Sequence, residues 1–172
     1  MRWFPRAGRR SLTAIAAPLL AAPLLAASAG LALPGESAAA AVTRPVVTTD
    51  RGAVRGTTGG GMDSFFGIPY AAAPVGSRRW APPQPAAAWT GVREATGYGS
   101  SCPVRAGNGA LTGKENCLFL NIRRPSGLPA GARRPVFVFI HGGGLVSGSS
   151  DNIGLSPLVR TAGVVGVSPT GG

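Results

Sequence analysis

The sequence feature that most constrains this chain is an apolar run, residues 136–140, that leads directly into His141 and three glycines. The run Val-Phe-Val-Phe-Ile is apolar throughout, as expected of a β-strand that is covered on both faces. Successive glycines leave the next stretch of backbone without side chains, so its N–H groups can approach a ligand closely. Backbone amides placed in this way stabilise the negative oxygen that develops on an attacked carbonyl group. The pattern therefore predicts a buried strand followed by an anion-stabilising loop.

Residues 1–41 have the order typical of a secretory signal peptide. Four arginines precede an alanine- and leucine-rich stretch over residues 12–33, and small residues follow up to Ala41. We expect cleavage after Ala41, and therefore a secreted protein without a stable membrane anchor. An uncleaved anchor is the alternative, because the apolar stretch is long enough to span a bilayer. Three prolines within and just after the stretch disfavour a spanning helix.

The chain is strongly basic, with a formal net charge of +11. Removal of residues 1–41, which hold four arginines and one glutamate, would lower this value by three, to +8. A basic excess is compatible with nucleic-acid binding. However, the remaining arginines are scattered, and no zinc-finger, RNA-recognition or basic-helix pattern accompanies them. We therefore predict no nucleic-acid partner.

The chain contains two cysteines, Cys102 and Cys117. In an exported protein an even pair favours a disulfide, whereas in a reducing compartment both would remain thiols. Two cysteines and the distant His141 provide too few ligands, at no recognised spacing, for a zinc site. We predict neither a metal nor another cofactor.

Local patterns outline the order of secondary structure after residue 41. Gly52 lies at the turn of a short predicted hairpin. The proline- and alanine-rich stretch over residues 71–88 has no helical or strand period, which predicts an ordered loop. Predicted strands cover residues 46–48, 53–55, 64–68, 118–122, 136–140 and 164–167, and a short helix is predicted at 155–162. Antiparallel strands followed by strand, helix and strand indicate the opening of an α/β sheet.

Four motifs occur in a definite order along the chain: FGIPYA with PVGSRRW over residues 66–80, PPQP with Trp89, ENCLFLNI over residues 115–122, and HGGG with SGS over residues 141–149. Together they resemble the type-B carboxylesterase and lipase family, whose members have the α/β-hydrolase fold. Asn116 stands where that family usually has aspartate, and Leu145 where it has phenylalanine. The resemblance implies that residues 42–172 are the N-terminal part of such a domain, with antiparallel strands leading into a mostly parallel sheet.

The resemblance also implies roles for the glycine loop. Gly143 and Gly144 match the positions whose N–H groups form two donors of the oxyanion hole, the third donor following the nucleophile. His141 and Gly142 match positions that shape this loop, and the histidine is not the general base there.

Two further pairs of residues have counterparts in the family. Cys102 and Cys117 match the family's first disulfide. Arg79 and Glu115 match an ion pair that is structural in the family and holds the early loop against the disulfide region.

None of the four motifs contains a catalytic nucleophile. The segment GESAA at residues 35–39 resembles the family's nucleophile elbow, but its last glycine is replaced by Ala39. It also lies in the signal region and ahead of the oxyanion loop, whereas the catalytic serine, acid and histidine follow that loop in the family. We assign Ser37 no catalytic role, and the nucleophile, acid and base are expected to be absent.

The resemblance implies a carboxylic ester hydrolase that acts on a small-molecule ester through an acyl-enzyme, and residues 1–41 predict that it is exported. We predict that the 172 residues are an inactive N-terminal fragment that keeps the oxyanion loop. The alternative is a non-catalytic secreted binding module of the same fold, or a degenerate remnant, because fold does not determine function.

Overall fold

The computed structural model describes residues 44–144, 146–151 and 153–170, which all belong to the unit formed by residues 40–172. The predicted signal peptide and the elbow-like segment at residues 35–39 lie outside the described residues. None of the helices in the described ranges has the length and apolarity needed to cross a membrane. The elements are β1 (Val46–Thr48), β2 (Ala53–Arg55), β3 (Thr57–Gly59), β4 (Met62–Pro69), a 3-10 turn (Gly76–Arg78), β5 (Val92–Glu94), β6 (Val104–Arg105), β7 (Leu111–Thr112), β8 (Phe119–Pro125), β9 (Val136–Val138), α1 (Ser156–Ala162) and β10 (Val165–Pro169).

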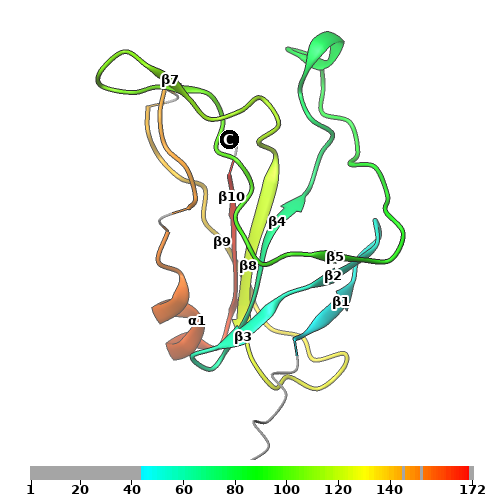
Figure 1. Ribbon diagram of the computed structural model, residues 1–172. Coiled ribbons are helices and arrows are strands. Elements are labelled where there is room, and N and C mark those ends of the chain that lie inside the picture. The colour runs from blue at the N-terminus through cyan, green and yellow to red at the C-terminus, as the bar shows by residue number, and fades with distance from the viewer. Residues whose placement is uncertain (1–43, 145, 152, 171–172) are drawn as a thin grey trace, which may run out of the picture. The chain divides into compact units, whose positions relative to one another are not determined.

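The main sheet has the strand order β3-β4-β8-β10-β9 (Figure 1). Strands β3, β4 and β8 pair antiparallel, and β10 pairs antiparallel with β8. The last pair, β10 and β9, is parallel, with Val167 opposite Val138. This order confirms the predicted fold class, in which antiparallel strands lead into a parallel part of an α/β sheet.

Helix α1 connects β9 to β10 and packs on the sheet. Pro157 lies in its first turn, where a missing N–H group costs nothing, and Gly163 ends it in the left-handed conformation. Val159 and Leu155 are buried, and both lie against Gly166 of β10, where an added Cβ would be 3.1–3.3 Å from their side chains. The absence of a side chain at Gly166 therefore lets the helix approach the sheet closely.

A second, smaller sheet has the order β1-β2-β5. Strands β1 and β2 form the predicted hairpin, and the backbone N–H of Thr49 donates to the carbonyl oxygen of Gly52 at 3.0 Å. Strand β5 was not predicted and pairs parallel with β2. A core cluster shared with β4 lies under this sheet and consists of Val54, Phe65, Ile68 and Ala95, with Val47, Trp89, Leu120 and Ile122 packed against it.

The pairing of β4 with β8 is interrupted by a bulge between Phe65 and Ile68. Gly67 occupies the bulge with φ = 67°, and a side chain there would collide with the carbonyl oxygen of Gly97. A bulge leaves backbone groups without partners in the ladder. Asn121 of β8 satisfies one of them, because its Oδ1 accepts from the N–H of Gly67 at 3.1 Å.

Buried Asp63 connects three neighbouring strands of the main sheet, β3, β4 and β8. Its Oδ1 accepts from the Thr58 hydroxyl on β3 at 2.7 Å, and its Oδ2 accepts from Arg124 Nε on β8 at 3.2 Å. Both partners lie opposite Asp63 in the strand register. The carboxylate is thus paired and hydrogen-bonded, as a buried charge must be.

The prediction that β9 is buried on both faces is wrong. We expected a strand buried on both faces, but all three of its residues are exposed, Val136 to 62% and Val138 to 57%. The reason is position, because β9 lies at the edge of the sheet formed by the described strands. Its apolar side chains therefore have a neighbouring strand, β10, on one side only.

Several other elements differ from the prediction in extent. Strands β4 and β8 are longer than expected, and β3, β6 and β7 were not predicted. The stretch over residues 71–88 is a loop, as predicted, apart from the 3-10 turn and one bridge between Ala71 and Pro85.

Candidate oxyanion site

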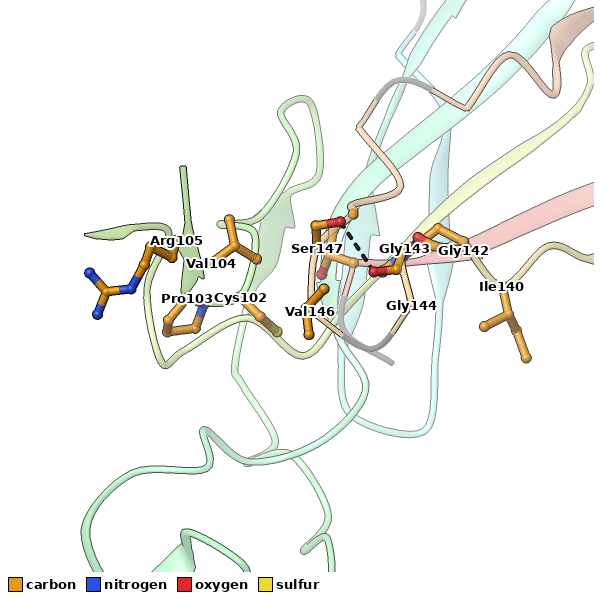
Figure 2. Close-up of a pocket in the computed structure, with 13 residues that line it drawn as sticks. Cys102, Pro103, Val104, Arg105, Ile140, Gly142, Gly143, Gly144, Val146 and Ser147 are labelled. Carbon is orange, nitrogen blue, oxygen red and sulfur yellow. Dashed lines mark hydrogen bonds between the residues drawn. The ribbon is translucent and has the colours of Figure 1, made fainter. Parts of the chain in front are cut away.

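The glycine loop begins where the parallel strands end. The backbone N–H of Phe139 donates to the carbonyl oxygen of Val167 at 2.8 Å, which is the last bond between these two chain segments before the loop. A cavity of about 470 Å³ lies beside the loop (Figure 2). The loop contributes residues 140–144 and 146–148 to its wall, and Thr170 and the chain around Cys102 contribute the rest. Positioned at the ends of parallel strands, the cavity is where ligands bind in open α/β sheets.

Three glycines of the loop have backbone conformations that other residues rarely adopt. The φ angles are 143° at Gly143, 61° at Gly144 and 109° at Gly148. A Cβ on Gly143 would lie 1.9 Å from the carbonyl oxygen of Ser147, and one on Gly148 would lie 2.3 Å from that of Gly142. Both contacts are far below van der Waals distance, so this loop path requires glycine at these positions.

His141 holds the start of the loop through its side chain. Its Nδ1 lies 3.0 Å from the carbonyl oxygen of Gly142. A carbonyl oxygen only accepts hydrogen bonds, so this contact assigns a proton to Nδ1. Gly148 packs against the ring, where an added Cβ would lie 2.6 Å from Nδ1. The histidine therefore joins the two ends of the loop.

The bond from His141 also sets the direction of a predicted oxyanion donor. The carbonyl of Gly142 and the N–H of Gly143 belong to one planar trans peptide unit, so they point in opposite directions. The bond from His141 fixes the Gly142 oxygen on the histidine side, so the N–H of Gly143 points away from the histidine. The other ring nitrogen, Nε2, is buried without a hydrogen-bond partner among the described residues, so it is not paired with a serine hydroxyl there. This agrees with a role in shaping the loop.

Gly143 and Gly144, the predicted oxyanion donors, both line the cavity. Backbone amides that donate to an alkoxide oxygen stabilise it, and removal of one such donor in a working site lowers kcat about 10²–10³-fold. Arg105 also lines the cavity, but its guanidinium group donates to the carbonyl oxygen of Gly109 at 2.7 Å and points away from the glycines (Figure 2). The charge of Arg105 is thus not directed at the glycines.

The structure contains the predicted disulfide between Cys102 and Cys117, whose Cα atoms lie 4.9 Å apart. Cys117 is buried and Cys102 lines the cavity. The bridge therefore attaches the hairpin of β6 and β7 to the start of β8, beside the site. It closes one wall of the cavity.

Thr170 joins this disulfide wall to the end of β10. Its hydroxyl donates to the carbonyl oxygen of Cys117 at 2.5 Å and accepts from the N–H of Phe119 at 3.1 Å. Thr170 is buried and lines the cavity. The sequence gives no signal for Thr170, because a lone threonine near a strand end has no distinguishing pattern.

Arg79 and Glu115, the predicted ion pair, are in contact. Both side chains remain almost half exposed, at 49% and 43%, and neither lines the cavity. An exposed ion pair contributes about 0–1 kcal/mol, since solvent screens the charges. The pair fastens the loop after β4 to the disulfide region without reaching the site. In the described part of the chain, no three histidine, cysteine or acidic side chains form a cluster able to hold a metal ion.

Comparisons with known proteins bear on this site. Residues 43–170 match the sequence model of the carboxylesterase family. Phenmedipham hydrolase of Pseudarthrobacter oxydans is 41% identical over 138 residues, which cover 74% of this chain and 28% of that protein. Human carboxylesterase 3 is 36% identical over 156 residues, covering 80% of this chain and 27% of that protein.

Solved structures give the same result. A PNB esterase superposes with a TM-score of 0.67 at 35% identity, covering 74% of this chain and 27% of that one. The carboxylesterase EST55 of Geobacillus stearothermophilus superposes with a TM-score of 0.64 at 39% identity, covering 74% and 26%. The chain thus spans little more than a quarter of the length of these relatives.

Proposed function

Because the chain belongs to the carboxylesterase family, we propose that it supplies the oxyanion-binding part of an exported serine-type carboxylic ester hydrolase. The observation that carries this proposal is the cavity wall of consecutive glycines. The carbonyl oxygens of Gly142 and Gly143 accept hydrogen bonds from the side chains of His141 and Ser147. The N–H groups of the same two peptide units, on Gly143 and Gly144, point the opposite way and can donate to a ligand.

The proposed chemistry is acyl transfer. A serine attacks the ester carbonyl carbon, a histidine takes the serine proton, and a carboxylate orients the histidine. The carbonyl oxygen gains negative charge as the tetrahedral intermediate forms, and the amides of Gly143 and Gly144 would donate to it. Donors held in place before the reaction need no reorganisation during it, which is why fixed backbone amides are effective here.

We further propose that the nucleophile, acid and base come from sequence other than residues 44–170. In the described residues the sole histidine is engaged by the loop, and its free nitrogen has no hydroxyl partner. The chain spans 28% of phenmedipham hydrolase, so most of a full-length relative has no counterpart in it. An oxyanion loop without a nucleophile has no alkoxide to stabilise, so the 172 residues alone should not turn over esters.

Small-molecule carboxylic esters are the proposed substrate class, and export is proposed from the order of residues 1–41. The apolar and polar walls of the cavity fit a neutral ester carbonyl better than a large charged ligand, since the cavity's arginine is directed away. The name of phenmedipham hydrolase refers to that relative alone.

The test begins with the coding DNA. Reading on from the codon of Gly172 should reveal a GESAG-like elbow, an acid and a late histidine. The longest protein that this DNA encodes (the longest product) and the 172-residue chain are then assayed with a p-nitrophenyl ester. The longest product should hydrolyse it and the chain should not. Gly143→Pro in the longest product should abolish turnover because proline lacks an N–H group, and Gly154→Ala, in open space on the same segment, should not.

Two outcomes would overturn the proposal. Turnover by the purified 172-residue chain, above the level of its own Gly143→Pro variant, would mean that a nucleophile is present in it. A genuine stop without triad sequence beyond it would favour the non-catalytic secreted module or the degenerate remnant.

A further inference from the structure

We infer that Ser147 is a positioning residue, whose hydroxyl aims the backbone amide of Gly144 into the oxyanion site. The inference rests on the proposed function of the loop. Ser147 Oγ donates to the carbonyl oxygen of Gly143 at 3.2 Å (Figure 2). The backbone N–H groups of Val146 and Ser147 donate to the same oxygen, at 3.2 and 3.1 Å. Three donors thus converge on one carbonyl oxygen of the loop.

The direction of this oxygen decides the direction of the amide. The carbonyl of Gly143 and the N–H of Gly144 are the two ends of a single trans peptide unit, and they point in opposite directions. Ser147 and Val146 hold the oxygen on the side of the following turn. The N–H of Gly144 must then face away from that turn. Gly144 lines the cavity together with Val146 and Ser147, and the inference assigns this N–H to the oxyanion site.

This peptide unit needs such support because glycine flanks it on both sides. Neither Gly143 nor Gly144 has a Cβ, and both have φ angles in the range that favours glycine. Rotation of the unit would meet little steric resistance from side chains. A flipped unit would present a carbonyl oxygen to the cavity in place of an N–H group, and this oxygen would repel an oxyanion. Each hydrogen bond to the Gly143 oxygen opposes that flip.

The same bonds also make the amide a better donor. Hydrogen bonds arranged in a chain polarise one another, and a bond accepted by a carbonyl draws electron density away from its own N–H end. Donation by Ser147 Oγ therefore strengthens the Gly144 N–H toward a negative oxygen. The two backbone donors do this in any sequence, whereas the hydroxyl can be removed by mutation. Among the three donors to the Gly143 oxygen, only the Ser147 hydroxyl is a side-chain group, so a mutation at this position can change the strength of the Gly144 N–H as a donor.

The effect on rate should be moderate. Removing a whole oxyanion donor lowers kcat about 10²–10³-fold, so removing one of three supports behind a donor should lower it by roughly 3- to 10-fold. The substrate's ground-state contacts do not depend on this support. The loss should therefore appear in kcat, with KM nearly unchanged.

The decisive experiment observes the peptide unit directly, without relying on ester hydrolysis. A three-dimensional NMR experiment of the HNCO type correlates each N–H with the carbonyl carbon of the preceding residue. The Gly144 cross-peak reports both ends of the unit in question. It is recorded on the isotope-labelled chain, at a concentration at which sedimentation finds monomer. Ser147→Ala should move this cross-peak, with lower carbonyl-carbon frequency because the oxygen loses a donor, and Ser147→Thr should restore it.

Ser149→Ala is the matched control, because the Ser149 hydroxyl accepts from the N–H of Asp151 and has no such bond to Gly143. It should leave the Gly144 cross-peak in place. The inference is wrong if Ser147→Ala leaves the cross-peak unmoved, if Ser149→Ala moves it equally, or if the unmodified chain shows no dispersed Gly144 cross-peak.

The catalytic effect is measured on the longest ester-hydrolysing product. Ser147→Ala should lower kcat at constant KM, and Ser147→Thr should recover it. Hydrolysis with equal kcat in all three would refute the inference while leaving the proposed function intact. A shifted cross-peak in a product that hydrolyses no ester would instead refute the proposed function alone.

Discussion

The side-chain amide of Asn121 donates a hydrogen bond to the hydroxyl oxygen of Ser150 over 2.8 Å. Both residues are buried. The same amide nitrogen lies 3.3 Å from the carbonyl oxygen of Ser168 on β10, and the side-chain oxygen accepts from the bulge at Gly67. One asparagine in the middle of the sheet thus anchors β4, β10 and the chain that returns from the glycine loop.

Asn121→Ala should therefore be strongly destabilising. The substitution removes the partner of the part-buried N–H of Gly67 and of the buried hydroxyl of Ser150, and a buried polar group without a partner costs about 1–3 kcal/mol. We expect the free energy of unfolding to fall by about 3 kcal/mol in urea titrations followed by tryptophan fluorescence. Asn108→Ala is the control, since Asn108 is exposed and bonds only locally to Ala110. A loss for Asn121→Ala no larger than for this control would contradict the anchor.

Gly148→Ala should disrupt the glycine loop. The added methyl group would lie 2.3 Å from the carbonyl oxygen of Gly142 and 2.6 Å from His141 Nδ1, at a φ angle of 109°. Backbone strain of this kind costs about 1–3 kcal/mol before the collisions are counted. Both the Gly143 and the Gly144 amide resonances should shift or broaden. Gly154→Ala, where nothing lies within 4 Å, should leave them unchanged; unchanged resonances in Gly148→Ala would mean that the loop follows another path.

Loss of the disulfide should destabilise the chain without unfolding the sheet. The bridge closes a loop with a sequence separation of 15. The chain-entropy model gives about 3 kcal/mol for a loop of this length. The double variant Cys102→Ser with Cys117→Ser should show this decrease in urea titrations, and reduction of the unmodified chain should reproduce it. An equal midpoint with and without the bridge would show that it carries no stability.

Glu94 should make stability depend on pH in the acid range. Desolvation opposes its ionisation, but hydrogen bonds and charge from Arg55 and Arg44, each 2.6 Å away, outweigh this and lower the pKa of Glu94 below its ordinary value of 4.5. A folded pKa below the unfolded one stabilises the folded state above the unfolded pKa, and this stability is lost as pH falls through the folded pKa. Unfolding midpoints of Glu94→Gln should be lower than those of the unmodified chain near pH 7. The difference should shrink below about pH 4.5, and a constant difference would refute the linkage.

The exposed edge of β9 should promote self-association. Its unpaired backbone groups and apolar side chains are a template for another strand. Val138→Lys places a charge on this edge and should raise the monomer fraction in sedimentation velocity runs. Leu111→Lys is the comparison, because Leu111 is 71% exposed on β7, away from β9. Equal effects of the two variants would indicate a general effect of charge.

Much of the site could be predicted because its signals are local. The glycines at 143, 144 and 148 have backbone conformations that other residues rarely adopt, and two cysteines favour one bridge if the chain is exported. The hairpin turn at Gly52 follows from the same kind of short-range preference. Thr170 and Ser150 could not be found in this way, since isolated hydroxyl residues are common and their partners lie far along the chain.

The sequence by itself determined six of the strand segments, the turn at Gly52, and that three glycines free backbone amides after residue 140. Only the tertiary structure decided that β9 lies at an edge, that Asn121 fills the bulge at Gly67, and that Ser147 reaches the Gly143 carbonyl. The physical reason is range. Conformational preference acts between neighbours in the chain, whereas burial and hydrogen-bond partnership depend on the register of strands that meet only after the sheet has formed.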